Sequence, residues 1–573
     1  MAAPKRRSLG QVEQALRSEY GRKQWNMQGS DWNLASIWEA IADRVGDRDA
    51  LCHGEMVRSW SEFETRAARC AAVLEECGIG HDHKVAFYSY NGPEYVEATF
   101  AAFKVRAIPV NVNYRYTATE LMYLFENSEA TAVIVDSRLA ANLEPLLAQL
   151  PLLRLVLQVG DGPLLPGAVR YEEALADACP ASRINRSPED LWFLYTGGTT
   201  GMPKGVMWPH RSLLLTSAPT FKSLRLPTPS SPEEAATVAE RIHELGGETR
   251  LLPAAPLMHG TSAISSWGAL CSAGAIITCG AASFDAAEVL ESVQRHRANT
   301  LTIVGDAFAK PIIAELVRAE GEGEPYDLSS LSLVVSSGVM WSAETKSELM
   351  ARADVICADL LGSSEGVGFA RSVSKRDRPS RTAEFRLGEF GQVFNDAGEP
   401  VVPGSGERGL LAVGGPIPIG YYKDPAKTAE SFREIGGKIW SVPGDWATVE
   451  VDGRITLLGR GSACINTAGE KVFPEEVEET LKTHIGVIDA NVVGVPDEKW
   501  GTAVVAVISC EDPAPSAAEL TAHCRLTLAG YKCPKRMVFV DSVQRGPNGK
   551  ADYRWVKSVA ERAVAEQAVA EQP

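Results

Sequence analysis

Short apolar runs alternate with amphipathic segments along most of this chain, and this alternation restricts the fold more than any other feature of the sequence. The runs expected to form buried strands are residues 85–90, 132–135, 155–159 and 301–304. Two segments show the pattern of amphipathic helices, residues 95–105 and 287–296. Strands that alternate with helices in this way predict an α/β fold.

The pattern changes after Gly406, where short β segments are separated by turn residues. A separate small α/β unit begins near Arg460, with an expected helix over residues 474–482 and expected strands over 490–495 and 504–508. With 573 residues, the chain is long enough for more than one hydrophobic core. The sequence thus predicts at least two domains.

The charge balance is acidic, with 57 Lys and Arg against 73 Asp and Glu and a formal net charge of -16. Nucleic-acid backbones are bound by clustered Lys and Arg, so this balance favours small-molecule partners. No segment approaches the ~20 consecutive apolar residues of a membrane helix, and the basic start MAAPKRRSLG is not followed by an apolar stretch. We expect a cytoplasmic protein without a membrane span, and the sequence leaves open whether it forms a homo-oligomer.

Three local features call for structural rather than functional interpretations. The eleven cysteines occur singly, without a CxxC pair, and are expected to be free thiols in packed surroundings. Residues 227–250 contain PTPSSPEE and are expected to form a mobile surface insertion. The tail repeats AVAEQ and is expected to be a solvated helix or disordered.

The segment LYTGGTTGMPKGV, residues 194–206, packs glycines, threonines and one lysine into a loop directly after an apolar strand expected over 191–195. Backbone N–H groups of such a loop, with threonine hydroxyls and a lysine, can surround a chain of phosphate groups. The spacing matches neither the Walker A pattern nor GxGxxG. It resembles the phosphate loop of the adenylate-forming (ANL) superfamily, which includes acyl-CoA synthetases, firefly luciferase and the adenylation domains of peptide synthetases.

Further motifs of that superfamily follow in order. PLMHGT, residues 256–261, resembles the second core motif and LGSSEG, residues 361–366, the motif that ends in a magnesium-binding Glu. GDWATVEVDG, LLGRG and PNGK resemble the later motifs that carry a ribose-binding Asp, a ribose-binding Arg and the lysine of the C-terminal domain. The resemblance covers residues 194–550 and extends to the N-terminal segment FYSYNGPEYVEATFAAFKVRAIPVNVNY.

The resemblance assigns roles to individual residues. It implies the catalytic residues Lys550, Lys204, Glu365 and His259, with Glu365 as the metal ligand. It implies the nucleotide-binding residues Thr196, Gly197, Gly198, Thr199, Thr200, Gly201, Lys204, Gly338, Asp359, Ser364, Glu365, Asp445 and Arg460. The implied acyl pocket contains His259, Trp267, Asp306, Gly338, Met340 and Trp341, although packing is the commoner role for the two tryptophans. The implied CoA tunnel and hinge contain Ser462, Ala468, Gly469, Glu470 and Lys471.

The resemblance also implies a fold and a reaction. A large N-terminal domain with several subdomains, residues 1–459, would be joined by a hinge at 460–464 to a small, mobile α+β cap at 465–558, followed by a tail at 559–573. A carboxylic acid would react with ATP and Mg²⁺ to an acyl adenylate, and CoA would then displace AMP. In this superfamily the cap rotates between the two steps.

Some positions depart from the superfamily's usual residues. Gly197 stands where Ser is common, Leu361 where an aromatic residue is common, and Ser364 where Thr is common. Ser462 and Ala468 replace a usual Asp or Lys and a usual Gly. These departures raise the alternative that the enzyme performs only thioester formation from a preformed acyl adenylate.

The substrate class is suggested by the segment GRGSACINTAGEKVFPEEVEE, which looks like a branch of acyl-CoA synthetases that act on steroid side-chain and other bulky acids. We expect a hydrophobic acid, either alicyclic, such as a terpenoid or steroid acid, or fatty. Two other interpretations remain. GSSEG also satisfies the GxSxG pattern of serine hydrolases, with Ser364 as nucleophile, and the chain could be a catalytically silent relative that binds nucleotide.

Overall fold

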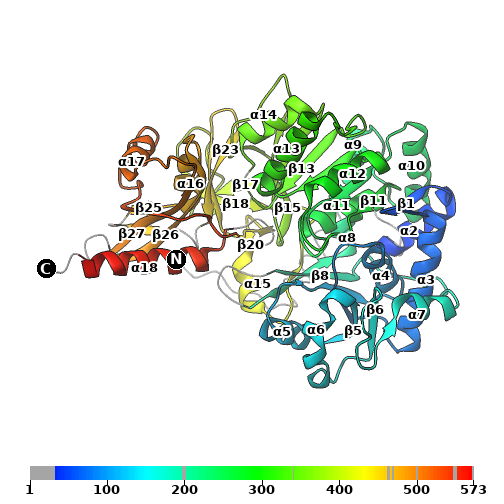
Figure 1. Ribbon diagram of the computed structural model, residues 1–573. Coiled ribbons are helices and arrows are strands. Elements are labelled where there is room, and N and C mark those ends of the chain that lie inside the picture. Colours follow the sequence, from blue (N-terminus) through cyan, green and yellow to red (C-terminus); the bar gives the residue numbers. More distant parts are fainter. Residues whose placement is uncertain are drawn as a thin grey trace. The chain divides into compact units, whose positions relative to one another are not determined.

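The computed structural model describes residues 32–196, 202–339, 341–460, 465–467, 470–497, 501–528, 530–545 and 551–570 (Figure 1). Its contacts divide it into two compact units. The first unit contains the described residues up to Thr382 together with Val413–Ser441, and the second contains Ala383–Ala412 and the described residues from Val442 onward. Both units combine helices with sheets, which confirms the predicted α/β class.

One sheet of the first unit carries the predicted phosphate loop. Its strand order is β19-β9-β8-β4-β3-β5-β6-β7. The strands are β3 (Lys84–Tyr88), β4 (Ile108–Asn111), β5 (Ala130–Asp136), β6 (Leu155–Val159), β7 (Val169–Arg170), β8 (Leu191–Thr196), β9 (Lys204–Pro209) and β19 (Gly420–Tyr421). The strands from β8 to β7 run parallel, whereas β9 is antiparallel to both of its neighbours. Buried parallel strands are apolar on both faces, which is why β3, β5 and β6 could be predicted from their sequence.

The second sheet of the first unit has the strand order β2-β1-β11-β10-β12-β13-β14-β15. These strands are β1 (Asp49–His53), β2 (Met56–Ser59), β10 (Arg250–Pro253), β11 (Ala275–Thr278), β12 (Thr300–Ile303), β13 (Leu333–Ser337), β14 (Ile356–Ser363) and β15 (Gly366–Ser374). The six strands from β1 to β14 run parallel, while β2 and β15 are antiparallel to their neighbours. A hairpin of β20 (Phe432–Ile435) and β21 (Lys438–Ser441) also belongs to this unit.

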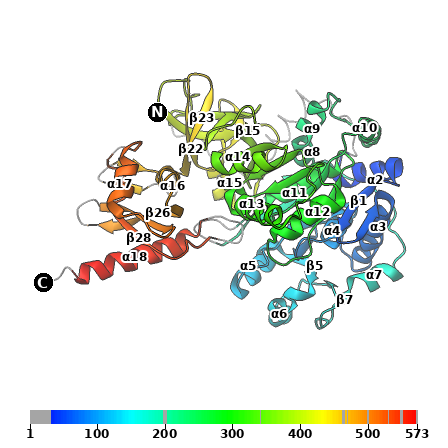
Figure 2. The same cartoon turned by 45° about the horizontal axis from the view of Figure 1, so that its top comes forward.

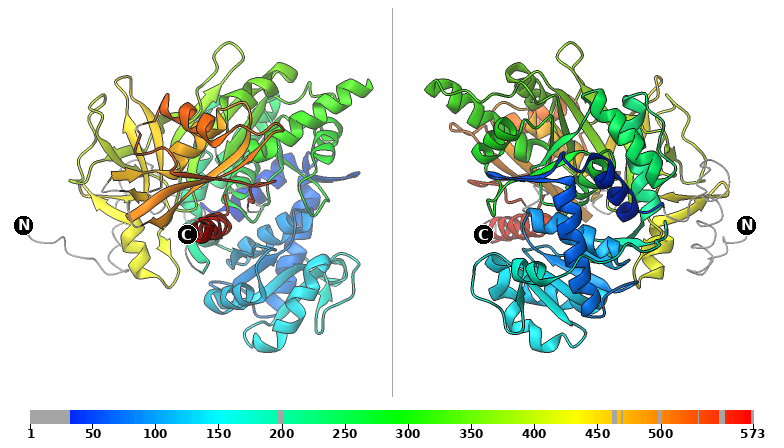
Figure 3. Two further views of the ribbon diagram at one scale, coloured as in Figure 1. Left: turned by 60° about the vertical axis from the view of Figure 1, so that its left-hand side comes forward. Right: turned by 90° about the vertical axis from the view of Figure 1, so that its right-hand side faces the viewer.

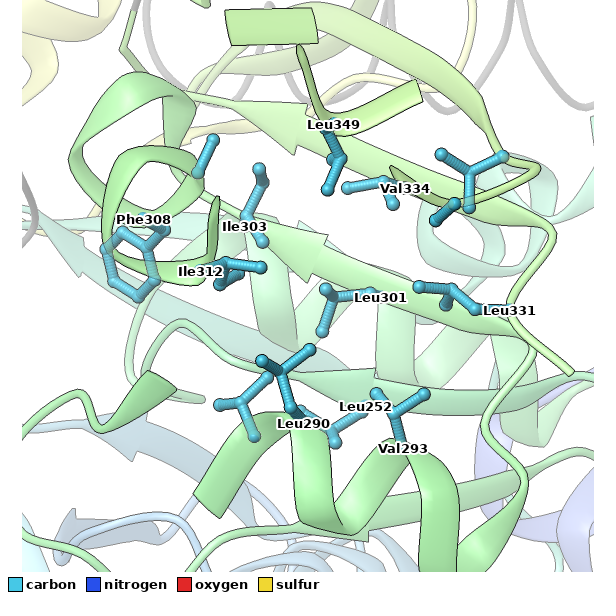
Figure 4. Packing of buried hydrophobic residues seen from close by; sticks show 14 of the residues in the cluster. Leu252, Leu290, Val293, Leu301, Ile303, Phe308, Ile312, Leu331, Val334 and Leu349 are labelled. Atoms are coloured by element: carbon cyan, nitrogen blue, oxygen red, sulfur yellow. The ribbon is translucent and has the colours of Figure 1, made fainter. Parts of the chain in front are cut away.

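Helices cover both sheets of the first unit (Figure 2). They are α2 (Leu34–Val45), α3 (Trp60–Glu76), α4 (Pro93–Lys104), α5 (Ala118–Ser128), α6 (Ala140–Leu143), α7 (Tyr171–Asp177), α8 (His210–Thr216), α9 (Ala218–Ser223), α10 (Pro232–Glu244), α11 (Gly260–Leu270), α12 (Ala286–His296), α13 (Gly305–Glu322), α14 (Ala343–Arg352) and α15 (Pro425–Ser431), with 3₁₀ turns at η1 (Ser137–Leu139) and η2 (Glu144–Gln149). One core lies between the second sheet and α12, α13 and α14. Figure 4 shows its side chains, including Leu290, Val293, Leu301, Ile303, Ile312 and Val334.

A layer of helices separates the two sheets. The helix α4 contacts β1 of one sheet and β4 of the other. At the centre of this layer, the ring of Trp38 from α2 lies 5.2 Å from Phe100 and 5.9 Å from Phe103 of α4. It also lies 5.8 Å from Trp267 of α11, measured between ring centroids. Aromatic packing thus holds together helices that are distant in sequence.

The expectation of a mobile insertion at residues 227–250 is wrong for most of that segment. Residues 232–244 form α10, whose N-terminus is capped by Ser231. The helix packs against α2 (Figure 3), with Ala239 and Ile242 buried and an ion pair of 2.6 Å between Arg44 and Glu240. The physical reason is an apolar stripe at helical spacing, which the preceding Pro and Ser residues obscure in the sequence.

The second unit contains an antiparallel sheet and the predicted small C-terminal fold. The sheet is formed by β16 (Glu384–Leu387), β17 (Gly391–Phe394), β18 (Arg408–Val413), β22 (Asp445–Val449) and β23 (Arg454–Arg460). The C-terminal part has the hairpin β24 (Ile465–Thr467) and β25 (Glu470–Val472), the three-stranded sheet β26 (Val487–Asp497), β27 (Gly501–Cys510) and β28 (Arg536–Phe539), and the helices α16 (Pro474–Lys482), α17 (Ala517–Arg525) and α18 (Tyr553–Ala570).

The C-terminal part confirms the predicted helix at 474–482 and the strands at 490–495 and 504–508. The helix α18 packs onto the sheet through Val556 and Ala560, so that an ordered helix occupies much of the expected tail. The predicted domain boundaries remain a prediction, because residues 461–464 of the hinge lie outside the described residues. None of the helices in the described ranges combines the length and the apolar character that crossing a lipid bilayer requires.

A buried carboxyl group in the second unit predicts a pH dependence of stability. Glu478 of α16 is 5% exposed and accepts hydrogen bonds from the Val492 N–H at 2.8 Å and the Tyr553 hydroxyl at 3.0 Å. Burial raises the pKa of Glu478 from 4.5 to about 8, and the neighbouring Glu475 adds to the rise. Because the folded state favours the protonated form, stability falls as the pH rises from about 4.5 to about 8.

The variant Glu478→Gln should remove this dependence, because its amide stays uncharged and has nearly the same shape. The wild type should lose roughly 4 kcal/mol relative to the variant across that pH range, measured as the free energy of unfolding in urea. Glu479→Gln, next in the helix, serves as the control. Parallel pH profiles for the wild type and Glu478→Gln would contradict the assignment.

Candidate functional site

The predicted phosphate loop connects β8 to β9, and the strand register pairs Thr196 with Lys204. Directly opposite residues in antiparallel strands point to the same face of a sheet. The structure therefore brings Thr196 and Lys204 to one face at the mouth of the loop. The predicted ligands between them, Gly197, Gly198, Thr199, Thr200 and Gly201, lie outside the described residues.

The strand β19 extends this face on the other side of β9. Tyr421 pairs with Val206, which lies two residues after Lys204 and therefore points to the same face. The hydroxyl of Tyr421 donates a hydrogen bond to Oε1 of Glu365 at 2.6 Å. The predicted metal ligand is thus anchored from the same face of the sheet as Lys204.

A second contact fixes the turn that carries Glu365. This turn joins β14 to β15, and its Ser364 carbonyl accepts a hydrogen bond of 3.0 Å from Nε1 of Trp208. Trp208 lies four residues after Lys204 on β9, so its side chain also points to that face. The face that β9 and β19 share with Lys204 therefore anchors Ser364 and Glu365, although these residues are far apart in sequence.

Lys204 forms an ion pair with Asp424, a residue not predicted from the sequence. Nζ of Lys204 lies 2.6 Å from Oδ2 of Asp424, and the two side chains are 36% and 31% exposed. The other carboxylate oxygen, Oδ1, accepts the Lys427 N–H at 2.9 Å at the start of α15. Burial alone would raise the pKa of Asp424, but the hydrogen bonds from Lys204 and the Lys427 N–H hold it below its usual value.

Several predicted site residues lie where parallel strands of the second sheet end. His259 precedes α11 after β10, Asp306 opens α13 after β12, and Gly338 follows β13 with a φ of 92°. Oδ1 of Asp306 accepts hydrogen bonds from Ser342, at 3.0 Å from its N–H and 3.2 Å from its hydroxyl. Ligands of parallel sheets bind at these carboxyl ends, so the arrangement is that of a binding edge.

Three predicted site residues instead pack in a core or form an ion pair. Trp267 is 2% exposed and packs on Trp38, and Trp341 is fully buried in the core of the second sheet. Asp359 lies within β14 at 4% exposure, with Oδ2 3.3 Å from Nζ of Lys346, and burial raises its pKa to about 6. Their predicted ligand contacts remain predictions, and Met340 lies outside the described residues.

The remaining predicted residues belong to the second unit. The register of β22 and β23 places Asp445 directly opposite Arg460, and their binding to the ribose stays a prediction. Glu470 and Lys471 lie on β25 of the β24–β25 hairpin. Ser462, Ala468, Gly469 and Lys550 are outside the part of the chain that the structure describes.

The described residues contain no cluster of three or more His, Cys, Asp or Glu side chains suited to a metal ion. Glu365 nevertheless fits a magnesium ion that arrives with phosphate groups, because Mg²⁺ is commonly held by one or two carboxylates plus substrate phosphates. The serine hydrolase interpretation lacks support. The two histidines that follow Ser364 in the sequence are engaged elsewhere, His484 with Glu519 and His523 with Thr480.

The chain matches two known protein families. Residues 38–422 match the family described as AMP-binding enzyme, and residues 476–550 match the family described as AMP-binding enzyme C-terminal domain. The described parts of these ranges include β8, β9, β14 and most of α16. The predicted site residues from Thr196 to Glu365 all fall within the first range.

Two curated relatives match the chain over nearly its whole length. The medium/long-chain-fatty-acid–CoA/3-oxocholest-4-en-26-oate–CoA ligase of Mycolicibacterium smegmatis is 39% identical, over 92% of this chain and 96% of the relative. The 3-oxocholest-4-en-26-oate–CoA ligase of Rhodococcus rhodochrous is 40% identical, over 92% of this chain and 95% of the relative.

Two solved structures share the fold. The anthranilate CoA ligase AuaEII in complex with anthranoyl-AMP has a TM-score of 0.78 at 22% identity, covering 94% of this chain and 99% of that one. The ATP-bound MatB of Rhodopseudomonas palustris has a TM-score of 0.76 at 23% identity, covering 93% and 99%. At these identities, the likeness establishes the fold.

The ion pair of Lys204 predicts an effect on ATP binding. If Lys204 binds phosphate groups as the sequence predicts, the carboxylate of Asp424 would compete with them for Nζ of Lys204, so Asp424→Asn should lower the dissociation constant of ATP about fivefold. The asparagine oxygen can still accept the Lys427 N–H, which keeps the start of α15 intact. Isothermal titration calorimetry measures the change, which should shrink at high salt.

A matched control is Asp285→Asn, which replaces the carboxylate that caps α12 in the same unit. Its dissociation constant for ATP should equal that of the wild type. An unchanged or weaker affinity in Asp424→Asn would show that Asp424 does not compete for the lysine.

Proposed function

The chain belongs to the family of AMP-binding enzymes, and from this premise we propose that it is an AMP-forming ligase that joins a hydrophobic carboxylic acid to CoA. The carrying observation is the 39–40% identity to acid–CoA ligases along more than nine-tenths of the chain. The face of β9 and β19 that carries Lys204 and anchors Ser364 and Glu365 supports it, because these residues come from the two motifs assigned to phosphates and metal.

The proposed substrates are medium- or long-chain fatty acids and bulky acids with a steroid side chain. Both classes appear in the name of the relative from Mycolicibacterium smegmatis, and the steroid acid appears in the name of the relative from Rhodococcus rhodochrous. The acidic net charge of -16 agrees with small-molecule partners. Within one class, pocket contacts decide the preference, and a single methylene changes it by about 1–3 kcal/mol.

The reaction needs two steps because a carboxylate is a poor acyl donor. The acid first attacks the α-phosphorus of ATP and releases pyrophosphate, which creates an acyl adenylate. Lys204 and Thr196 would neutralise and orient the phosphate groups, and Lys550 would bridge the carboxylate and the phosphate in the transition state. The CoA thiol then attacks the acyl carbon, and AMP leaves.

Glu365 would hold Mg²⁺ together with the phosphates, and the bound ion would supply positive charge that offsets the charge developing on the leaving pyrophosphate. The hydroxyl of Tyr421 donates a hydrogen bond to Oε1 of Glu365 at 2.6 Å. This bond orients the carboxyl group. Asp445 and Arg460 would bind the ribose hydroxyls, as their opposite positions on β22 and β23 permit.

The proposed first step is tested by exchange of pyrophosphate into ATP without CoA. The assay uses a panel of fatty acids of several lengths, 3-oxocholest-4-en-26-oate, and acetate and benzoate as controls. We expect exchange with the fatty or steroid acids and none with acetate. Exchange limited to acetate or benzoate would overturn the substrate class. No exchange, together with thioester formation from a synthetic acyl adenylate, would establish the enzyme of the second half-reaction only.

The role of Lys550 separates the two half-reactions. Lys550→Ala should reduce pyrophosphate exchange by at least about 100-fold, because the lysine acts on charge that develops in adenylation. Thioester formation from supplied acyl adenylate and CoA should stay within about threefold of the wild type. Lys557→Ala, on α18 of the same unit, is the control. Equal loss of both half-reactions in Lys550→Ala would contradict the assignment.

A further inference from the structure

A buried asparagine links the two sheets at the binding edge. Asn111 ends β4 and is 3% exposed. Its Nδ2 donates to the Tyr195 carbonyl at 2.9 Å and to the Met258 carbonyl at 2.7 Å, and its Oδ1 accepts the Tyr195 N–H at 2.5 Å. Both amide hydrogens and the amide oxygen are therefore used.

These hydrogen-bond partners directly precede residues of two separate predicted subsites. Tyr195 directly precedes Thr196, where the predicted phosphate loop begins. Met258 directly precedes His259, which the resemblance assigns to the acyl channel. The first residue lies on β8 of one sheet and the second lies on the connection from β10 to α11 of the other. One side chain therefore sets the spacing between the chain segments that lead into both subsites.

The hydrogen bonds between the Asn111 side chain and the Tyr195 backbone extend the pairing of β4 and β8 past their backbone hydrogen bonds. The strands β4 and β8 pair in parallel at Val110 and Phe193. Beyond this pair the Asn111 side chain binds both backbone polar groups of Tyr195. Leaving a buried N–H or carbonyl without a hydrogen-bond partner costs about 1–3 kcal/mol. Conformations that keep these hydrogen bonds are therefore favoured over conformations that break them.

A second asparagine holds only the acyl side. Asn91 follows β3, and its Nδ2 lies 3.2 Å from the Pro253 carbonyl and 3.1 Å from the Ala255 carbonyl. Its Oδ1 accepts the Leu257 N–H at 2.7 Å. These bonds go to the last residue of β10 and to the connection from β10 to α11. Asn91 is thus a suitable comparison for Asn111, because it uses the same side-chain amide to bind the acyl side but does not bind Tyr195 in these contacts.

We propose that Asn111 is a positioning residue that holds Tyr195, at the start of the phosphate loop, and Met258, at the start of the acyl loop, in mutual register, so that the acid's carboxylate lies in line with the α-phosphorus. Asn91 positions the acyl loop alone. This inference rests on the proposed function, because the register matters only if both reactants bind at these loops. Adenylation is sensitive to such a register, since misplacing reactants by about 1 Å can cost about 100-fold in rate.

The test compares Asn111→Ala with Asn91→Ala in pyrophosphate exchange, with the wild type and the melting temperature measured in parallel. Asn111→Ala should raise KM for both ATP and the acid and reduce kcat at least about tenfold. Asn91→Ala should raise KM for the acid while KM for ATP stays within about twofold. Thioester formation from supplied acyl adenylate should fall less than exchange in Asn111→Ala, because the acyl and phosphate groups are then already joined.

Two results would overturn the inference. One is that both variants change the same kinetic constants by the same factors. The other is that Asn111→Ala loses both half-reactions in proportion to its loss of folded protein, which is the result expected of a purely structural residue.

A failure of the proposed function gives a different pattern, because the wild type itself then shows no exchange and no thioester formation. In that case the dissociation constant of ATP, measured by calorimetry, still tests whether Asn111 positions the start of the phosphate loop. Asn111→Ala should weaken ATP binding by at least about threefold and Asn91→Ala should not. Equal ATP affinities in the two variants would overturn the inference there as well.

Discussion

The candidate site depends on one strand, β9, being hydrogen-bonded on both sides to antiparallel neighbours. The pairing with β8 closes the phosphate loop, and the pairing with β19 brings Tyr421 to the same face. Because side chains alternate along a strand, Lys204 and Trp208 also share this face. Contacts from Tyr421 and Trp208 then hold the turn that carries Glu365. A shift of β9 by one residue would point Lys204 and Trp208 to the opposite face and separate them from Tyr421.

The remainder of the first unit places a second set of binding loops against this face. The parallel strands β10, β12 and β13 all end near predicted site residues. The aromatic cluster around Trp38 and the bonds of Asn91 and Asn111 connect the sheet that bears these loops to the sheet that bears the phosphate loop. Packing sets the separation of the sheets, while directional hydrogen bonds set the register of the loops, because dispersion contacts alone tolerate small displacements.

Local patterns in the sequence predicted much of the fold, since β3, β5, β6, α12 and α16 have periodicities that depend on near neighbours alone. The resemblance to the adenylate-forming superfamily placed Lys204 and Glu365 in one site. Asp424 escaped prediction because its contact with Lys204 spans 220 residues and no local pattern marks it. Asp359 and Trp267 show the converse case. Their residue types suit a binding site, but only the strand and helix faces reveal their partners in packed surroundings.

The order of the chain through the two units has a consequence for biosynthesis. The first unit is interrupted after Thr382 and is completed only by Val413–Ser441, the segment that contributes β19, Tyr421 and Asp424. A nascent chain that has passed Thr382 therefore already contains both large sheets but still exposes the unpaired edge of β9. The ribosome must add the intervening part of the second unit before that edge is covered. During this interval, the unpaired edge is a site at which a chaperone or another nascent chain can pair.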